Sequence, residues 1–153
     1  MRVGKKILLI ASAVFIVLQF FQPKRNNRLG TSNNDITKIY KVPENVKAIL
    51  KNSCYDCHSN STRYPWYTLI QPIGWFMNSH VEEGKSELNF NEFGSYSSRR
   101  QRSKLRSIGE SIEDGSMPIA SYTLIHKSAK LTSQEKISIK VWLAGLEDSS
   151  STK

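Results

Sequence analysis

The sequence contains only two cysteines among its 153 residues, Cys54 and Cys57. A protein zinc site usually has four ligands, and these often come as two Cys or His pairs at matching spacing. Because no third cysteine is present, the sequence counts against a zinc site of this kind.

Acidic residues are missing from residues 1–30, which contain six of the 22 lysines and arginines. The other 123 residues carry sixteen basic and thirteen acidic side chains, which is a net charge of +3. The total of +9 is therefore partly a property of the N-terminal segment. It gives no argument for a nucleic-acid partner.

No segment alternates polar and apolar residues over enough positions for a β-strand, and no internal repeat is visible. Several segments instead combine an apolar face at helical spacing with a helix start signal. The sequence therefore predicts an all-α fold. The predicted helices begin at Pro43, at Pro72 or Ile73 (ending near Gly84), at Ser97 (ending at Asp114) and at Thr132, which forms a capping box with Glu135.

The sequence has one long apolar run, Ile7–Phe21, and three basic residues precede it. Small residues are missing just after the run, so it does not end like a cleavable signal peptide. We expect residues 1–23 to form an uncleaved membrane anchor, since residues 3–23 approach the roughly 20 apolar residues that span a bilayer. A cleaved signal peptide and a buried core helix are the alternatives.

Residues 54–58 read Cys-Tyr-Asp-Cys-His, which matches the C-x-x-C-H attachment sequence for a c-type haem. The two thiols can add to the two porphyrin vinyl groups, and the imidazole of His58 can bind the iron from one side. Residues three and four apart on a helical turn share a face, so all three side chains can point at one macrocycle. A thiol–disulfide redox centre normally follows a β-strand and is a weaker alternative, as is a structural disulfide.

An electron-carrying haem needs a second axial ligand, normally a methionine thioether or a second imidazole. The candidates are Met77, His80, Met117 and His126. We favour Met117, because the following Pro118 holds the backbone extended and lets the side chain reach across to a metal. His80 is the main alternative, since it lies on the apolar face of its predicted helix.

Two further segments are candidates for a role at the haem or in docking. Arg63 and Trp66 lie in an aromatic loop that could line the haem, with Arg63 pairing with a propionate; the alternative is that these aromatics fill a core. Five basic residues crowd the first half of one predicted helix, where they form either a docking patch or an ordinary solvated face. They are Arg99, Arg100, Arg102, Lys104 and Arg106.

The order of these features resembles that of the monohaem cytochromes c, which run from a helix through C-x-x-C-H and a Met-Pro loop to a closing helix. A closer resemblance is to the small bacterial haem-binding domain family, over about residues 43–145. It rests on residues 54–60, 64–67, 80–84 and 88–90, together with Met117-Pro118, Tyr122 and His126. The resemblance implies a cytochrome c-like helical domain with one haem c bound covalently through Cys54 and Cys57.

Composition and resemblance together divide the chain into four parts. They are an anchor or signal-like segment at 1–23, a polar tether at 24–41, a haem-binding domain at 42–147 and a disordered tail at 148–153. Because covalent attachment of haem c takes place outside the cytoplasm, the resemblance implies a haem domain in the periplasm, held by a single-pass anchor in the cytoplasmic membrane.

The first functional hypothesis is a membrane-tethered monohaem c-type cytochrome that carries single electrons outside the cytoplasmic membrane, and is thus not an enzyme. Its expected partners are an acidic redox protein and the membrane, bound through residues 3–23, with no nucleic acid. The alternative is a haem-based sensor or small peroxidase with a labile sixth ligand, where His80 acts as an acid–base group. A third hypothesis is an interaction domain with a redox-active Cys54–Cys57 disulfide.

Overall fold

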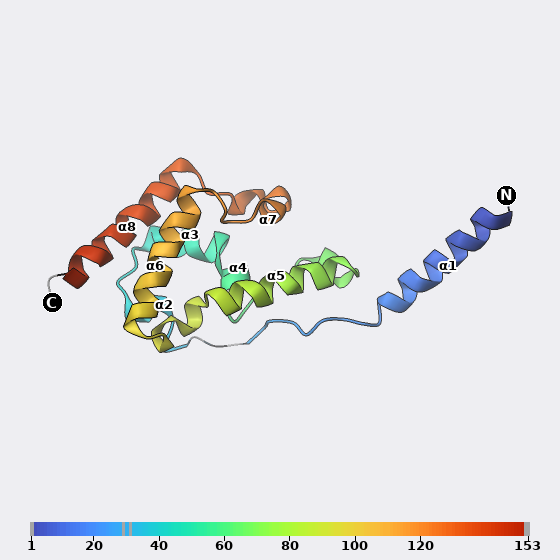
Figure 1. The fold of residues 1–153 in the computed structure, drawn as a ribbon, viewed down its shortest axis with the longest axis horizontal. Coiled ribbons are helices and arrows are strands. Elements are labelled where there is room, and N and C mark those ends of the chain that lie inside the picture. Colours follow the sequence, from blue (N-terminus) through green and yellow to red (C-terminus); the bar gives the residue numbers. More distant parts are fainter. Residues whose placement is uncertain (1, 29, 31, 152–153) are drawn as a thin grey trace.

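The computed structural model describes residues 2–28, 30 and 32–151. All the regular secondary-structure elements in these ranges are helices (Figure 1). This confirms the predicted all-α fold. The α-helices are α1 (Arg2–Leu18), α2 (Ile36–Ile39), α3 (Glu44–Ser53), α4 (Tyr55–His58), α5 (Ile73–Glu87), α6 (Ser98–Glu113), α7 (Ala120–Ile125) and α8 (Ser133–Ser151). Three short 3-10 helices complete the set: η1 (Trp66–Leu69), η2 (Phe90–Ser95) and η3 (Lys127–Ala129).

The helices of the domain begin where the start signals predict. Pro43 directly precedes α3, and the Ser97 hydroxyl accepts a hydrogen bond from the Arg100 amide in the first turn of α6. At α8 the Thr132 amide donates to the Glu135 carboxylate at 2.8 Å, and the Glu135 amide donates to the Thr132 hydroxyl at 3.3 Å. These reciprocal bonds satisfy amides that have no partner inside the helix.

The main core forms where α3, α6 and α8 pack together (Figure 1). Leu50 of α3, Ile108 of α6 and Ile139 of α8 are buried there, and Trp142 donates its indole hydrogen to the Lys41 carbonyl. A second, smaller apolar cluster forms around α5 and α7. It contains Met77, Val81, Tyr122 and Ala129, with Cys57 packed against it. Cys54 packs against the main core, so each of the two cysteines contacts a different apolar cluster.

The N-terminal helix corrects one prediction. α1 has 17 residues, so at 1.5 Å per residue it is about 26 Å long, shorter than the roughly 30 Å apolar core of a bilayer. Among the described residues, no helix has both the length and the apolar character that a membrane span requires. The predicted single-pass anchor is therefore wrong, and so is the predicted localisation in the cytoplasmic membrane that depends on it.

Glutamine side chains attach the end of α1 to the rest of the molecule. The Gln71 backbone amide donates to the Gln19 side-chain oxygen at 2.8 Å, and the Gln71 side-chain NH2 group donates to the Gln22 side-chain oxygen at 2.8 Å. Gln22 in turn donates to the Leu69 carbonyl at 3.1 Å. These bonds fix the start of α5 against the chain that leaves α1.

Residues 24–41, expected to be a polar tether, make specific contacts with the helical domain. Ile36 is fully buried in the main core, and Asn26 is buried with its side chain donating to the Ser59 carbonyl at 2.8 Å. Asn27 forms an isolated antiparallel bridge with Ser61. The divisions of the chain at residues 23, 41 and 147 stay predictions. The disordered tail over 148–153 also stays a prediction, and α8 extends into this stretch as far as Ser151.

Candidate functional site

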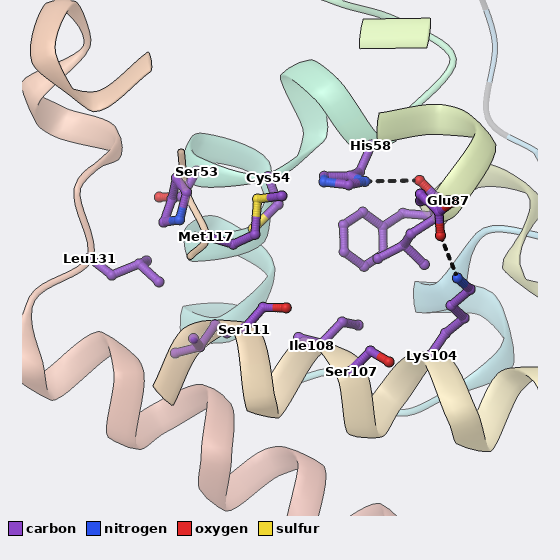
Figure 2. Close-up of a pocket in the computed structure, with 14 residues that line it drawn as sticks. Ser53, Cys54, His58, Glu87, Lys104, Ser107, Ile108, Ser111, Met117 and Leu131 are labelled. Atoms are coloured by element: carbon purple, nitrogen blue, oxygen red, sulfur yellow. Dashed lines mark hydrogen bonds and ion pairs between the residues drawn. The ribbon is translucent and has the colours of Figure 1, made fainter. Parts of the chain in front are cut away.

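A cavity opens beside the C-x-x-C-H turn and has two adjoining lobes of about 270 Å³ each. Both lobes are lined mainly by apolar atoms, and they share six lining residues from four parts of the fold. Figure 2 shows the first lobe. The shared residues are Ser53, Cys54, His58, Glu87, Met117 and Pro118. Pockets for small ligands and cofactors commonly have volumes of about 300–1,000 Å³, so the two lobes together reach this range.

Both cysteines lie at this cavity as the sequence predicts. Cys54 joins α3 to α4, and its carbonyl accepts hydrogen bonds from the amides of Cys57 at 3.2 Å and His58 at 3.0 Å, which closes a helical turn. Burial raises the pKa of Cys54 to about 12 and that of Cys57 to about 11. Both thiols are therefore protonated at neutral pH, which counts against a reactive thiolate centre.

Hydrogen bonds fix the orientation and the tautomer of His58. Its Nδ1 lies 2.9 Å from the Gly84 carbonyl and 3.0 Å from the Leu88 carbonyl. Because a carbonyl can only accept, Nδ1 carries the hydrogen and Nε2 keeps a lone pair. The edge of the ring opposite these bonds points towards Cys54 and Met117 (Figure 2). Burial lowers the pKa of His58, which favours the neutral imidazole that binds metals.

Gly84 lets α5 approach the C-x-x-C-H turn closely. A Cβ atom added at residue 84 would lie 2.8 Å from the carbonyl oxygen of Cys57 and 3.2 Å from the Cβ atom of Cys57. No larger residue fits without moving α5 away from α4, and such a movement would also take the Gly84 carbonyl away from His58. Sequence reasoning placed a helix end near Gly84 and missed this role; α5 in fact continues to Glu87.

Met117 reaches the cavity from the loop that follows α6. Gly115 ends that helix with φ +75°, a conformation that favours glycine, and the Met117 amide donates to the Ser111 carbonyl at 3.1 Å. Met117 lines both lobes and is 39% exposed. Figure 2 shows its side chain next to Cys54. The structure thus brings Met117 to the same cavity as His58 and the cysteines.

The other candidate axial ligands have different surroundings. His80 lines the second lobe, and its Nδ1 donates to the Phe76 carbonyl at 2.9 Å, so Nε2 keeps its lone pair. Met77 is buried in the smaller apolar cluster and lines neither lobe. His126 also lies outside both lobes, and its Nε2 is 2.6 Å from the Tyr67 hydroxyl.

The aromatic loop does not reach the cavity. Arg63 binds Asp56 through two parallel contacts, Nε to Oδ1 at 3.0 Å and Nη2 to Oδ2 at 3.0 Å, and it lines a different cavity. Trp66 is 75% exposed and lines neither lobe. The structure therefore does not bring these two predicted residues together with Cys54, Cys57 and His58.

Asp56 is a structural centre that sequence reasoning missed. Its buried carboxylate accepts hydrogen bonds from the Tyr122 hydroxyl at 2.6 Å and from the Arg63 amide at 3.2 Å, besides the guanidinium. Burial raises the pKa of Tyr122, and the bond to Asp56 raises it further. Asp56 thus joins the C-x-x-C-H turn to α7, which follows the Met117 loop. In the sequence, the one sign of this role is that Asp56 is an acidic residue between Cys54 and Cys57.

The residues at the cavity fit a haem better than a bare metal ion. Two thiols, an imidazole with a free Nε2 and a thioether are the groups that attach and ligate a haem of the c type. Leu88, Phe90 and Ile108 add apolar walls that suit a porphyrin face. By contrast, the described part of the chain contains no group of three or more His, Cys, Asp or Glu side chains that could hold a metal ion by itself.

Comparison with known protein families gives a match over most of the chain. The sequence model of a family described as a haem-binding domain matches residues 13–145, which is most of the chain and includes every residue of the cavity. A search of curated proteins found no match, and neither did a search of solved structures.

Proposed function

Because the chain belongs to the haem-binding domain family and is therefore a haem protein, we propose that it is a monohaem c-type cytochrome that carries single electrons. In this proposal Cys54 and Cys57 form thioether bonds to the haem, His58 is the proximal iron ligand and Met117 is the distal one. His80 is the alternative distal ligand.

The observation that carries this proposal is the convergence of four side chains on one cavity. His58 offers the lone pair of Nε2, and two backbone carbonyls hold its ring in place through Nδ1. Met117 lines the same cavity from a separate loop. Hydrogen-bonded partners of a metal-binding histidine fix its ring orientation and raise its basicity. The raised pKa values of Cys54 and Cys57 count against disulfide exchange, which needs a thiolate.

A bound haem supplies the one-electron chemistry of its iron, and the protein determines where that chemistry takes place. The Gly84 and Leu88 carbonyls keep the Nδ1 proton of His58 in place, so that Nε2 faces the cavity. Leu88, Phe90 and Ile108 exclude water from its walls. Burial and ligand identity are two of the ways in which a protein sets a haem potential, and thioether ligation raises that potential.

The distal ligand can be tested by replacing Met117. We expect Met117→Ala to abolish a sulfur-to-iron charge-transfer band in the oxidised protein. We also expect the reduction potential to fall on the order of 0.1 V, within the range of about 0.8 V that axial ligands cover. Absorption spectra and a potentiometric titration measure these changes. Met77→Leu is the matched control, since Met77 lies outside the cavity.

A result in which Met117→Ala keeps the wild-type spectrum while His80→Ala changes the spin state would assign the distal position to His80.

One observation also favours a second candidate function, a sensor or small peroxidase with a weakly held sixth position. Met117 is partly exposed, and His80 lines the same lobe with an available Nε2 that could act as an acid–base group. Carbon monoxide binding to the reduced protein discriminates, because a tightly six-coordinate carrier resists it.

We also propose that an acidic redox partner docks on the exposed basic face of α6. Arg99, Arg102 and Arg106 are exposed on this helix, and none has an ion pair with a described residue. Unpaired cations attract an acidic surface over a distance that salt shortens to about 8 Å at physiological ionic strength.

Electrostatic docking predicts a salt-dependent rate. With an acidic electron-transfer protein as partner, the second-order rate constant should fall several-fold as salt rises from low to physiological concentration. The double variant Arg102→Gln/Arg106→Gln should show a lower rate at low salt and a weaker salt dependence. Lys5→Gln/Lys6→Gln removes the same charge from α1 and should have little effect. Equal effects of the two double variants would show that only net charge matters.

A further inference from the structure

One face of α6 brings polar groups into an otherwise apolar cavity. Lys104, Ser107 and Ser111 have the spacing i, i+3 and i+7, which places them on one side of the helix, and all three line the first lobe. Figure 2 shows them along the cavity wall formed by α6, below His58 and Cys54. The lobe therefore has an apolar body with one cationic side chain and two hydroxyl groups.

Lys104 lies close to the proposed iron ligand and is largely buried. Its side chain is 22% exposed, and it lines the same lobe of the cavity as His58. Burying an ammonium group is costly unless an anion accompanies it. In the structure that anion is Glu87, whose carboxylate lies 3.2 Å from the Lys104 Nζ atom.

The pairing of Lys104 with Glu87 is easily exchanged. The Glu87 side chain is 72% exposed at the edge of the cavity, so it can turn into water and stay fully solvated. Because water screens the exposed Glu87 carboxylate, this ion pair contributes little to stability. An anion that arrives inside the cavity could therefore replace Glu87 as the partner of Lys104 at small cost.

We propose that Lys104, assisted by the Ser107 hydroxyl, binds a carboxylate of the haem propionates, and that Glu87 holds this position in the haem-free protein. The proposal rests on the proposed haem site. It assigns the propionate to a residue other than Arg63, because the guanidinium of Arg63 already binds both carboxylate oxygens of Asp56 and lines another cavity. The Ser107 hydroxyl has no hydrogen bond to another described residue and can turn towards such a carboxylate.

Two porphyrins that differ only in their carboxylates test this assignment. The reduced, haem-free full chain is titrated with haemin and with haemin dimethyl ester, and binding is followed by the Soret absorbance. A charge-assisted hydrogen bond to a carboxylate is stronger than one to a neutral ester. We expect Lys104→Gln to weaken haemin binding roughly tenfold and to leave binding of the dimethyl ester unchanged. Arg63→Gln, the matched control, should change neither.

Glu87→Gln provides an effect of opposite sign. Removing the competing carboxylate leaves Lys104 without a charged partner, so haemin binding should become about threefold tighter, again without a change for the ester. A variant that simply damaged the fold would weaken both porphyrins and could not produce a gain for one of them.

Equal weakening of haemin and ester by Lys104→Gln would overturn the proposal, and so would a haemin-specific loss in Arg63→Gln. Failure of the proposed haem site would look different, because the wild-type chain would then bind neither porphyrin. Tight binding of both porphyrins, with no preference in any variant, would leave the haem site intact and remove only the carboxylate contact of Lys104.

Discussion

Replacing Cys54 and Cys57 with alanine is expected to abolish covalent haem attachment completely. Protein from a haem-maturing host should then lose all its haem to acidified acetone, whereas wild type should keep it. The reason is that no other thiol is present in the sequence to form a thioether bond. Because His58 and the apolar walls stay in place, the double variant should still bind haem reversibly before extraction.

The single variants and a neighbouring substitution serve as controls. Cys54→Ala and Cys57→Ala should each keep one thioether bond and hence retain haem in acid. Ser53→Ala, at a residue that lines the same lobes but carries no thiol, should retain it like wild type. Haem that stays attached in the double variant would show that the bond is formed by another residue.

Asp56→Ala is expected to lower the free energy of unfolding by about 3 kcal/mol. The substitution leaves the Tyr122 hydroxyl and the Arg63 amide without their acceptor, and hydrogen bonds to a charged group contribute about 1.5–3 kcal/mol each. Urea unfolding of the haem-loaded protein, followed by circular dichroism, measures the change. A loss of this size is a large part of the roughly 5–15 kcal/mol that holds a domain folded.

Substitutions of the two partners of Asp56 separate the contributions. Tyr122→Phe removes one buried hydrogen bond and should cost about 1–2 kcal/mol. Arg63→Gln should cost less than about 1 kcal/mol, because the Arg63 side chain is 62% exposed and water weakens its ion pair. If Arg63→Gln destabilised the protein as much as Asp56→Ala, the Arg63–Asp56 ion pair, and not the Tyr122 hydrogen bond, would be the main stabilising contact of Asp56.

Most of the helical fold could be predicted from local signals. The proline before α3, the serine cap of α6 and the capping box of α8 act within one helical turn, so their effect is visible in the sequence. Family membership could also be recognised, because Cys54, Cys57 and His58 form a compact motif. Met117 is far from them in sequence, but its Met-Pro context pointed to the cavity that it lines.

The roles that sequence reasoning missed depend on contacts between distant segments. Gly84 is needed because α5 approaches the Cys57 backbone, and Asp56 is buried because Tyr122 and Arg63 surround it. The sequence makes Arg63 a candidate for a propionate because its charge is visible there, whereas its partner Asp56 is visible only in the structure. The anchor prediction failed for a different reason, since apolar composition continues to Phe21 whereas α1 ends at Leu18.

The mass of one peptide is the most direct test of covalent haem attachment at the C-x-x-C-H sequence. Trypsin cleaves after Lys51 and Arg63, so residues 52–63 are released as a fragment that contains the whole C-x-x-C-H sequence. For wild-type protein made in a haem-maturing host, covalent attachment through Cys54 and Cys57 predicts that this fragment carries the mass of one haem under denaturing conditions. A fragment with the mass of its amino acids alone, from a host that loads another c-type cytochrome, would contradict it.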